Sequence, residues 1–322
     1  MSTGRPDQPW LVADIGGTNV RVAVVKGPQQ RPQTLCRLAT ADYGDLAEML
    51  SDAFTRLDGP PPRQVACALA SPVAGDDVRL TNAGWHFSVV KTQAQLGLER
   101  LEVMNDWVAQ GWAVPALSDN DLRTIQPGTP DPDAPRIALG PGTGLGTTLM
   151  TPHNGQWQVF AAEGGHISVA PTNAREAELI LELHRRFGHC SAERIASGTG
   201  LESVYSALCQ MDHCTAQAQD AEAIGQAATA GDAIALEAID LLTRILGSAT
   251  GDLMLATGAR GGVYIGGGLI PALGKHFDWQ AFRTRLQQKG RFDEYLRQIP
   301  VWLITHEAPA LLGLAHYLEE TA

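Results

Sequence analysis

The chain has 322 residues, of which 44% are hydrophobic and 18% charged, which suits two folded domains with buried cores and excludes a disordered protein. The net charge of −11 argues against non-specific binding to nucleic acid or to anionic membranes. Five cysteines without a CxxC pair argue against a disulfide framework and favour a reducing cytoplasm. Neither a membrane span nor an apolar signal core is expected, because every apolar run is interrupted by polar residues.

The first third of the chain alternates predicted strands and helices. Residues 10–27 are expected to form a strand, a glycine turn and a second strand, because alternate valines continue after Gly16 and Gly17. A Rossmann fingerprint is excluded, since a helix would follow its glycines directly. Apolar residues at helical spacing predict a helix over 44–60. Strands are expected at 34–40, 64–72 and 100–106, an inserted β segment at 78–88, a weak helix at 91–99 and another helix from 107.

A similar pattern returns about 125 residues later. Residues 136–150 again predict strand, glycine turn and strand, with a third strand at 157–166. Helices are expected at 172–188, 198–211, 232–256 and 309–320, a strand–glycine–helix unit at 261–273 and a strand at 299–306. Two such α/β units predict two related lobes with a cleft between them. The polar, proline-rich stretch 115–135 should join a small lobe of residues 1–116 to a large lobe of residues 117–306.

Three glycine turns stand at predicted strand ends. Glycine lets backbone N–H groups approach a ligand closely, and successive N–H groups form concavities that bind anions. Thr18 and Thr143 could add hydroxyl donors. Each turn alone could be an ordinary tight hairpin, but the three together favour a phosphate or nucleotide site. The residues expected to hold the nucleotide are Asp14, Gly16, Gly17, Thr18, Asn19, Gly142, Thr143, Gly144, Gly266, Gly267 and Gly268.

Asp14 ends the first predicted strand, directly before the first glycine turn. Mg²⁺ usually takes one or two carboxylates together with phosphate oxygens and water. We therefore expect Asp14 to hold Mg²⁺, directly or through water. An Asx turn, in which the carboxylate only caps its own backbone, is the structural alternative.

A family resemblance rests on a series of motifs in a fixed order. "ADIGGTNVRVA", "NDW", "LGPGTGLGTTLM", "AEGGHISVAP", "GHCSAERIASGTGL" and "GGVYIGGGLIP" resemble the bacterial glucokinase family of the actin/hexokinase-like ATPases, over about residues 10–318. The resemblance implies a two-lobed α/β (RNase H-like) fold with an interlobe cleft, and a last helix, about 307–322, that packs on the first lobe. The zinc-binding cysteine motif of the related ROK kinases is absent after His166, which argues against a metal-ligand role for that histidine.

The same resemblance implies an activity. The expected reaction is transfer of a phosphoryl group from ATP, with Mg²⁺, to the 6-hydroxyl of D-glucose, in a cytoplasmic homodimer. A kinase for another hexose or for an N-acetylhexosamine would share this chemistry. A DNA-binding repressor of the ROK type is disfavoured because only 13 residues precede Asp14. An actin-like filament or chaperone ATPase would have no use for the EGGH and SAER motifs.

The segment "RLEVMNDWVAQGWAV" places Asp106 between a predicted strand and a predicted helix. A primary alcohol is a weak nucleophile, and a nearby carboxylate can accept its proton, an effect worth about 10²–10⁴-fold. Apolar surroundings would raise the pKa of this carboxyl, and hydrogen bonds to it would lower its pKa. We interpret Asp106 as the general base. The alternative is that Asp106 is the N-cap of the helix that starts at Trp107.

A sugar site needs both donors and acceptors, which histidine, asparagine and glutamate side chains supply. The resemblance implies that Asn105 and Asp106 contact one side of the sugar and that Glu163, His166 and Glu193 bind hydroxyls near the anomeric carbon. Each of the last three could instead be structural, with Glu193 favouring a first helical turn. Asn82 and Trp85 are weaker candidates for the same site, with a buried structural tryptophan as the alternative.

Overall fold

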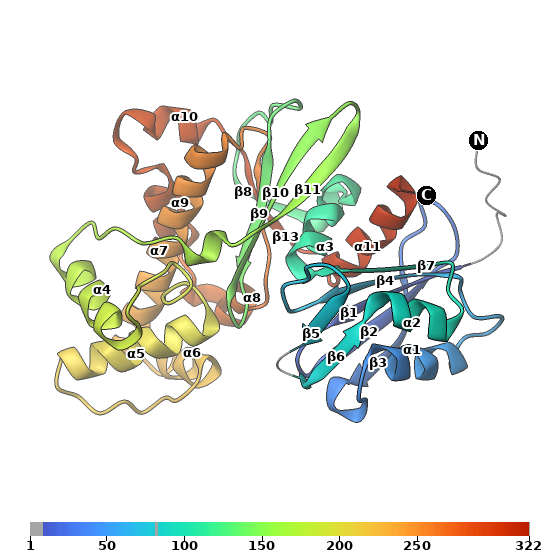
Figure 1. Cartoon of the computed structure of the whole chain (residues 1–322). Coiled ribbons are helices and arrows are strands. Elements are labelled where there is room, and N and C mark those ends of the chain that lie inside the picture. Colours follow the sequence, from blue (N-terminus) through green and yellow to red (C-terminus); the bar gives the residue numbers. More distant parts are fainter. Residues whose placement is uncertain (1–8, 81–82, 322) are drawn as a thin grey trace. The chain divides into compact units, whose positions relative to one another are not determined.

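The computed structural model describes residues 9–80 and 83–321 and divides into two compact units. The first unit comprises the chain up to Ser118 together with the segment from His306 onward. The second unit is Asp119–Thr305. Each unit has its own central sheet with helices around it (Figure 1). The chain is therefore a mixed α/β protein.

The first unit is built on a five-stranded sheet of order β3-β2-β1-β4-β7. β1 pairs antiparallel with β2, and β2 with β3, whereas β1, β4 and β7 run parallel to one another. Parallel register aligns Ile15, Leu69 and Asn105, so the carboxyl ends of three strands meet at one edge. The strands are β1 Trp10–Ile15, β2 Asn19–Val25, β3 Gln33–Ala39, β4 Gln64–Leu69 and β7 Arg100–Asn105.

Alternate residues of this sheet enter two separate cores. Leu11 and Ile15 of β1 pack in one core with Leu50 of α1, and Val12 packs in the other with Leu314 of α11. The helices are α1 Leu46–Thr55, α2 Val89–Leu96, α3 Asp106–Ala113 and α11 Pro309–Glu320. A small hairpin of β5 Asp77–Leu80 and β6 Trp85–Ser88 completes the unit.

Helix α11 covers the sheet beside α3, although the two helices are far apart in sequence (Figure 1). Gly313 permits this approach, because a Cβ at this position would collide with the backbone oxygen of Ala109 in α3. The close packing fixes α3, and with it the strand-to-helix junction at Asp106.

The second unit repeats the sheet topology of the first and adds one edge strand. Its order is β11-β10-β9-β12-β13-β8, with β9, β10 and β11 antiparallel and β9, β12 and β13 parallel. The strands are β8 Leu122–Gln126, β9 Arg136–Pro141, β10 Leu145–His153, β11 Gln156–Ala162, β12 Val263–Ile265 and β13 Val301–Ile304. The predicted relation between the two α/β units is confirmed by this common strand order.

Helix α7 is the central helix of the second unit. Its apolar residues pack against the helices α5, α6 and α9, as its nearly continuous apolar sequence predicts. The helices are α4 Ala174–Phe187, α5 Gly198–Met211, α6 Ala221–Thr229, α7 Ala233–Thr257, α8 Leu269–Leu273, α9 Trp279–Gln287 and α10 Asp293–Arg297. No helix among residues 9–80 and 83–321 is long and apolar enough to cross a bilayer.

Several elements differ from the sequence prediction. β8 lies inside the stretch 115–135, for which the sequence predicts a linker. Its buried Gln126 donates to the carbonyls of Leu296 and Ile299, so a polar residue replaces the expected apolar signal. Helices α6, α9 and α10 were not predicted, because they are short and rich in alanine or charged residues. Short 3-10 turns occur at Thr40–Asp42, Val114–Ala116, Asp119–Asp121, Gly164–His166, Gly274–His276 and Gly290–Phe292.

Candidate active site

The first glycine turn joins β1 to β2 and is hydrogen-bonded to a buried threonine. The Gly16 N–H donates to the Asn19 carbonyl at 2.9 Å, which closes the turn. Thr40, fully buried, donates its hydroxyl to the Gly16 carbonyl and its N–H to the Thr18 carbonyl, both at 2.9 Å. Thr18 and Asn19 are exposed on the turn, with Gly17 partly exposed. The turn is thus a fixed loop that presents polar groups to a ligand.

The junction between β7 and α3 corrects one reading of the sequence. Asn105, and not Asp106, is the N-cap of α3, because its side-chain Oδ1 accepts from the Trp107 N–H at 2.9 Å. Asn105 also donates its side-chain Nδ2 to the Ser71 carbonyl at 3.3 Å. Asp106 is the first helical residue, and its Oδ1 lies 2.9 Å from the same Trp107 N–H. The Asp106 carboxyl is therefore held by the backbone at the helix start and by a side-chain hydrogen bond with Asn105.

The pKa of Asp106 is raised from 3.8 to about 6. Burial of the carboxyl is the largest cause, and the negative charge of Asp14 is the second. The hydrogen bonds of the helix N-terminus act in the opposite direction. Burial also raises the pKa of Asp14, against the attraction of Arg21, its partner across the β1–β2 pair. Two carboxyls with raised pKa values therefore interact at the carboxyl ends of β1 and β7.

This pair fits a divalent cation. Two neighbouring carboxylates repel each other, and a cation with phosphate and water as its other ligands would relieve that repulsion. Among the described residues no group of three or more histidine, cysteine, aspartate or glutamate side chains could hold a metal by itself. The arrangement suits Mg²⁺, which needs few protein ligands, better than a metal bound only by side chains.

The second glycine turn joins β9 to β10 and is hydrogen-bonded to the start of α5. The Gly142 N–H donates to the Gly144 carbonyl at 2.8 Å. The Gly198 N–H donates to the Gly142 carbonyl at 2.8 Å, and the Thr199 hydroxyl donates to the Thr143 carbonyl at 3.1 Å. These bonds orient the turn so that the Thr143 side chain is exposed.

The third glycine turn follows β12 and lies beside the second. Gly267 has a φ of +88°, and a Cβ at this position would collide with the Pro141 carbonyl at the end of β9. The Gly266 N–H donates to the Leu139 carbonyl at 2.9 Å. A cavity of about 420 Å³ is lined by both turns and by three helix starts: Gly142, Thr143, Gly198, Thr199, Glu202, Asp220, Ala221, Glu222, Gly268 and Leu269. Two of the three predicted turns thus share one cavity.

A second cavity of about 550 Å³ adjoins the first, sharing Ala221, Glu222 and Leu269 with it. It continues between α6 and α8, along Gln226 and Thr229 on one side and Leu273 on the other. Sequence reasoning missed these residues, because α6 was not predicted. The only available signal was Asp220 followed by an alanine-rich segment, which is typical of a capped helix start.

The EGGH and SAER motifs meet in the second unit. His166 Nε2 lies 3.8 Å from Glu163 Oε2, and His166 Nδ1 lies 3.9 Å from Glu193 Oε1. Glu163 is 73% exposed and His166 58%, whereas Glu193 is only 27% exposed. The three side chains form one polar cluster with donors and acceptors, as a sugar site requires.

Glu193 also connects this cluster to the second glycine turn. Its Oε2 accepts from the Leu145 N–H at 2.9 Å, and a Cβ on Gly144 would come within 2.5 Å of the same oxygen. The Glu193 N–H donates to the Gly165 carbonyl at 2.8 Å. A side chain at position 144 would therefore displace the Glu193 carboxylate, whose bond to the Leu145 N–H holds it against the turn.

Asn82 and Trp85 are the two remaining candidates for the sugar site. Asn82 lies outside the described residues. Trp85 is 2% exposed and donates its indole N–H to the Tyr43 carbonyl at 2.8 Å, which is the structural alternative for this residue. Trp85 therefore anchors β6 to the chain that precedes α1.

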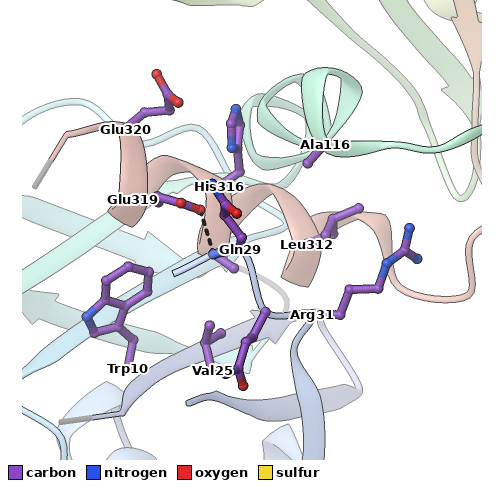
Figure 2. A pocket seen from close by; sticks show the side chains of 11 residues that line it. Trp10, Val25, Gln29, Arg31, Ala116, Leu312, His316, Glu319 and Glu320 are labelled. Atoms are coloured by element: carbon purple, nitrogen blue, oxygen red, sulfur yellow. Dashed lines mark hydrogen bonds between the residues drawn. The ribbon is translucent and has the colours of Figure 1, made fainter. Parts of the chain in front are cut away.

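Another cavity of the first unit, about 300 Å³, contains none of the predicted site residues (Figure 2). It lies between the chain after β2 and the end of α11, where the Gln29 N–H donates to Glu319 at 3.2 Å. The other labelled lining residues are Trp10, Val25, Arg31, Ala116, Leu312, His316 and Glu320.

The glycine turns, the paired carboxyls and the polar cluster are the features expected of a phosphotransferase of the actin/hexokinase-like type. The family model described as Glucokinase matches residues 11–321. A glucokinase of Chromobacterium violaceum is 42% identical over 99% of this chain and 92% of its own length. A glucokinase of Aromatoleum aromaticum is 42% identical over 99% of this chain and 97% of its own. The chain belongs to the glucokinase family.

A solved structure agrees with this assignment. The glucokinase of an Antarctic psychrotroph is 34% identical and superposes with a TM-score of 0.86, covering 97% of this chain and 98% of that one. The fold predicted from the sequence is confirmed by this likeness.

Proposed function

We propose that the protein transfers a phosphoryl group from ATP to the 6-hydroxyl of D-glucose, giving glucose 6-phosphate and ADP. The observation that carries the proposal is the Asp106 carboxyl, whose pKa is raised to about 6 at the edge where β1, β4 and β7 end. Membership of the glucokinase family and the names of the relatives support the choice of substrate.

Asp106 acts as the general base in this proposal. Its Oδ2 accepts the proton of the glucose 6-hydroxyl as the new P–O bond forms, while Oδ1 stays on the Trp107 N–H. A pKa near 6 suits the task, because the group is ionised at pH 7 yet binds a proton more strongly than an exposed aspartate.

The sugar is bound by polar side chains from the predicted set. Asn105, a predicted sugar contact, keeps its Oδ1 on the Trp107 N–H and donates its Nδ2 to the Ser71 carbonyl and to the Asp106 carboxyl, so it also positions the base. Glu163, His166 and Glu193 bind the hydroxyls near the anomeric carbon, with Glu193 Oε1 as the acceptor that its bond to Leu145 leaves available. Asn82 stays a prediction for the same site.

The nucleotide is bound by the glycine turns. The turn of Gly142, Thr143 and Gly144 supplies N–H and hydroxyl donors to the terminal phosphates, and the Gly16–Asn19 turn does the same from the first unit. Gly266, Gly267 and Gly268 let the adenosine lie against the backbone. The adjoining cavity between α6 and α8 is large enough for a base and ribose, which supports placing the adenosine there.

Asp14, next to Asp106, would hold Mg²⁺ directly or through water. The ion would neutralise phosphate charge that develops during transfer. The predicted homodimer and the predicted cytoplasmic location complete the proposal; light scattering of the purified protein tests the first.

The test is a coupled assay of ADP formation with ATP, Mg²⁺ and a panel of sugars. We expect ADP formation to depend on glucose, with a higher kcat/KM for glucose than for mannose or N-acetylglucosamine. A higher kcat/KM for another hexose would keep the chemistry and change the substrate. ADP release that no sugar stimulates would overturn the proposal.

A further inference from the structure

The end of helix α5 carries two cysteines in an arrangement that the proposed function does not use. The helix stops at Met211, and His213 adopts a left-handed conformation with a φ of +54°. The Cys214 N–H donates to the Cys209 carbonyl at 2.8 Å, and the His213 N–H donates to the Gln210 carbonyl at 3.3 Å. This pair of bonds, six-to-one and five-to-two, is a Schellman motif.

The motif itself brings the two cysteines together. Cys209 occupies the third position before the end of the helix and Cys214 the second position after the cap, and side chains at these positions commonly contact each other. A side-chain hydrogen bond joins Cys209 to Cys214, so the two thiols are in contact. The pair is therefore placed for disulfide exchange while both thiols are free.

The two thiols differ in their access to solvent. Cys214 is exposed, whereas Cys209 is 2% exposed and lies beneath it. The pKa of Cys209 is raised to about 11, first by burial and then by a side-chain hydrogen bond with Cys214. An external oxidant would reach Cys214 first, because the exposed thiolate is the nucleophile, and Cys209 would act second.

We infer that Cys209 and Cys214 form a reversible thiol–disulfide site that takes a low-molecular-weight disulfide as its oxidant. The Cys214 thiolate attacks one sulfur of the oxidant and releases the first thiolate, leaving a mixed disulfide. Cys209 then loses its proton to solvent and attacks Cys214 Sγ, which releases the second thiol and forms the protein disulfide. Two protein thiols are oxidised while one disulfide is reduced to two thiols.

The site is connected to the candidate nucleotide cavity through the chain that follows it. The Gln217 N–H donates to the Tyr205 hydroxyl at 3.4 Å, and that hydroxyl donates to Asp232 at 3.3 Å. Asp220, six residues after Cys214, caps α6 and lines the cavity of about 420 Å³. A Cys209–Cys214 disulfide would tie the segment 215–219 to the end of α5. The backbone amides of residues 215–219 should therefore exchange more slowly with solvent.

The test exposes the folded full-length protein to glutathione disulfide and follows its mass and its peptide map. We expect the wild type to lose two hydrogens and to show a Cys209–Cys214 cross-link that dithiothreitol removes. The Cys209→Ser variant should retain glutathione on Cys214, and Cys214→Ser should gain neither product at this site. Cys67 and Cys190, which are buried, serve as internal controls.

Circular dichroism and Tm of each variant check that it folds, and Cys209→Ala replaces Cys209→Ser if burial of the hydroxyl unfolds the chain. Slower hydrogen exchange of residues 215–219 in the oxidised wild type, by about threefold or more, would support the site independently of enzyme activity. A wild type that keeps a stable glutathione adduct on Cys214, or that links Cys214 between two chains, would overturn the inference.

Discussion

The hairpins β1–β2 and β9–β10 have the same topology and differ in the residue at the end of their first strand. Asp14 stands one residue before the end of β1, and the corresponding position of β9 is Gly140. The turn of the first hairpin accepts a hydrogen bond from the buried Thr40, whereas the turn of the second accepts one from the Gly198 N–H at the start of α5. One topology thus carries a carboxylate at the strand end in the first unit and a glycine at the same position in the second.

Asp106 of the first unit and Glu163 of the second differ in their burial and therefore in the environment of their carboxyl groups. Burial and a neighbouring carboxylate raise the pKa of Asp106, whereas Glu163 is 73% exposed to water. A proton acceptor benefits from a pKa near the working pH, while a group that binds a hydroxyl needs only a hydrogen-bonding geometry. The comparison is consistent with the proposed roles, in which Asp106 accepts the proton and Glu163 contributes to sugar binding.

The largest expected effect comes from Asp106→Asn. This change keeps the shape and removes the proton acceptor, so kcat should fall by about 10²-fold or more while glucose binding is largely kept. The coupled ADP assay measures kcat, and titration calorimetry measures glucose binding. Asp58→Asn, at an exposed position, is the matched control. A variant with nearly normal kcat would remove Asp106 from the role of base.

Asp14→Asn tests the carboxylate that distinguishes the first hairpin. We expect the Mg²⁺ concentration for half-maximal activity to rise by about tenfold, because one of few protein ligands is lost. The pKa of Asp106 should also fall, since the charge of Asp14 helps to raise it. A magnesium titration at saturating ATP and glucose measures the first effect. An unchanged magnesium requirement would assign Asp14 to the Asx turn instead.

The pH dependence of kcat/KM should follow Asp106. The base works when ionised, so activity is present above the raised pKa of about 6 and falls about tenfold per pH unit below it. Activity of the wild type at pH 5–8, corrected for enzyme stability, measures this limb. A profile that stays flat down to pH 4.5 would contradict the raised pKa.

Glu193→Gln tests whether the polar cluster of the second unit binds the sugar. The amide keeps the size of the side chain but loses charge beside His166, so the KM for glucose should rise by about fivefold to tenfold with a smaller change in kcat. Glu178→Gln, an exposed position on α4, is the control. An equal fall in kcat and kcat/KM with unchanged KM would place Glu193 in the transition state rather than in sugar binding.

Much of this arrangement could be predicted from the sequence. The alternating valines of β2 and the apolar stripe of α1 determine their own elements locally, and the glycine turns mark their strand ends. The N-cap alternative for Asp106 is excluded, because Asn105 caps the helix; the sequence could not decide this, since both residues cap well and only the length of β7 separates them. The cavity between α6 and α8 could not be foreseen, since its walls come from segments distant in sequence.

The proposed reaction depends most directly on the protonation state of the Asp106 carboxyl. A carbon-13 NMR titration of the aspartate side chains, assigned by comparison with Asp106→Asn, measures it in the free protein. We predict a pKa of about 6 for Asp106. A value at or below that of an exposed aspartate, about 3.9, would contradict the proposed base.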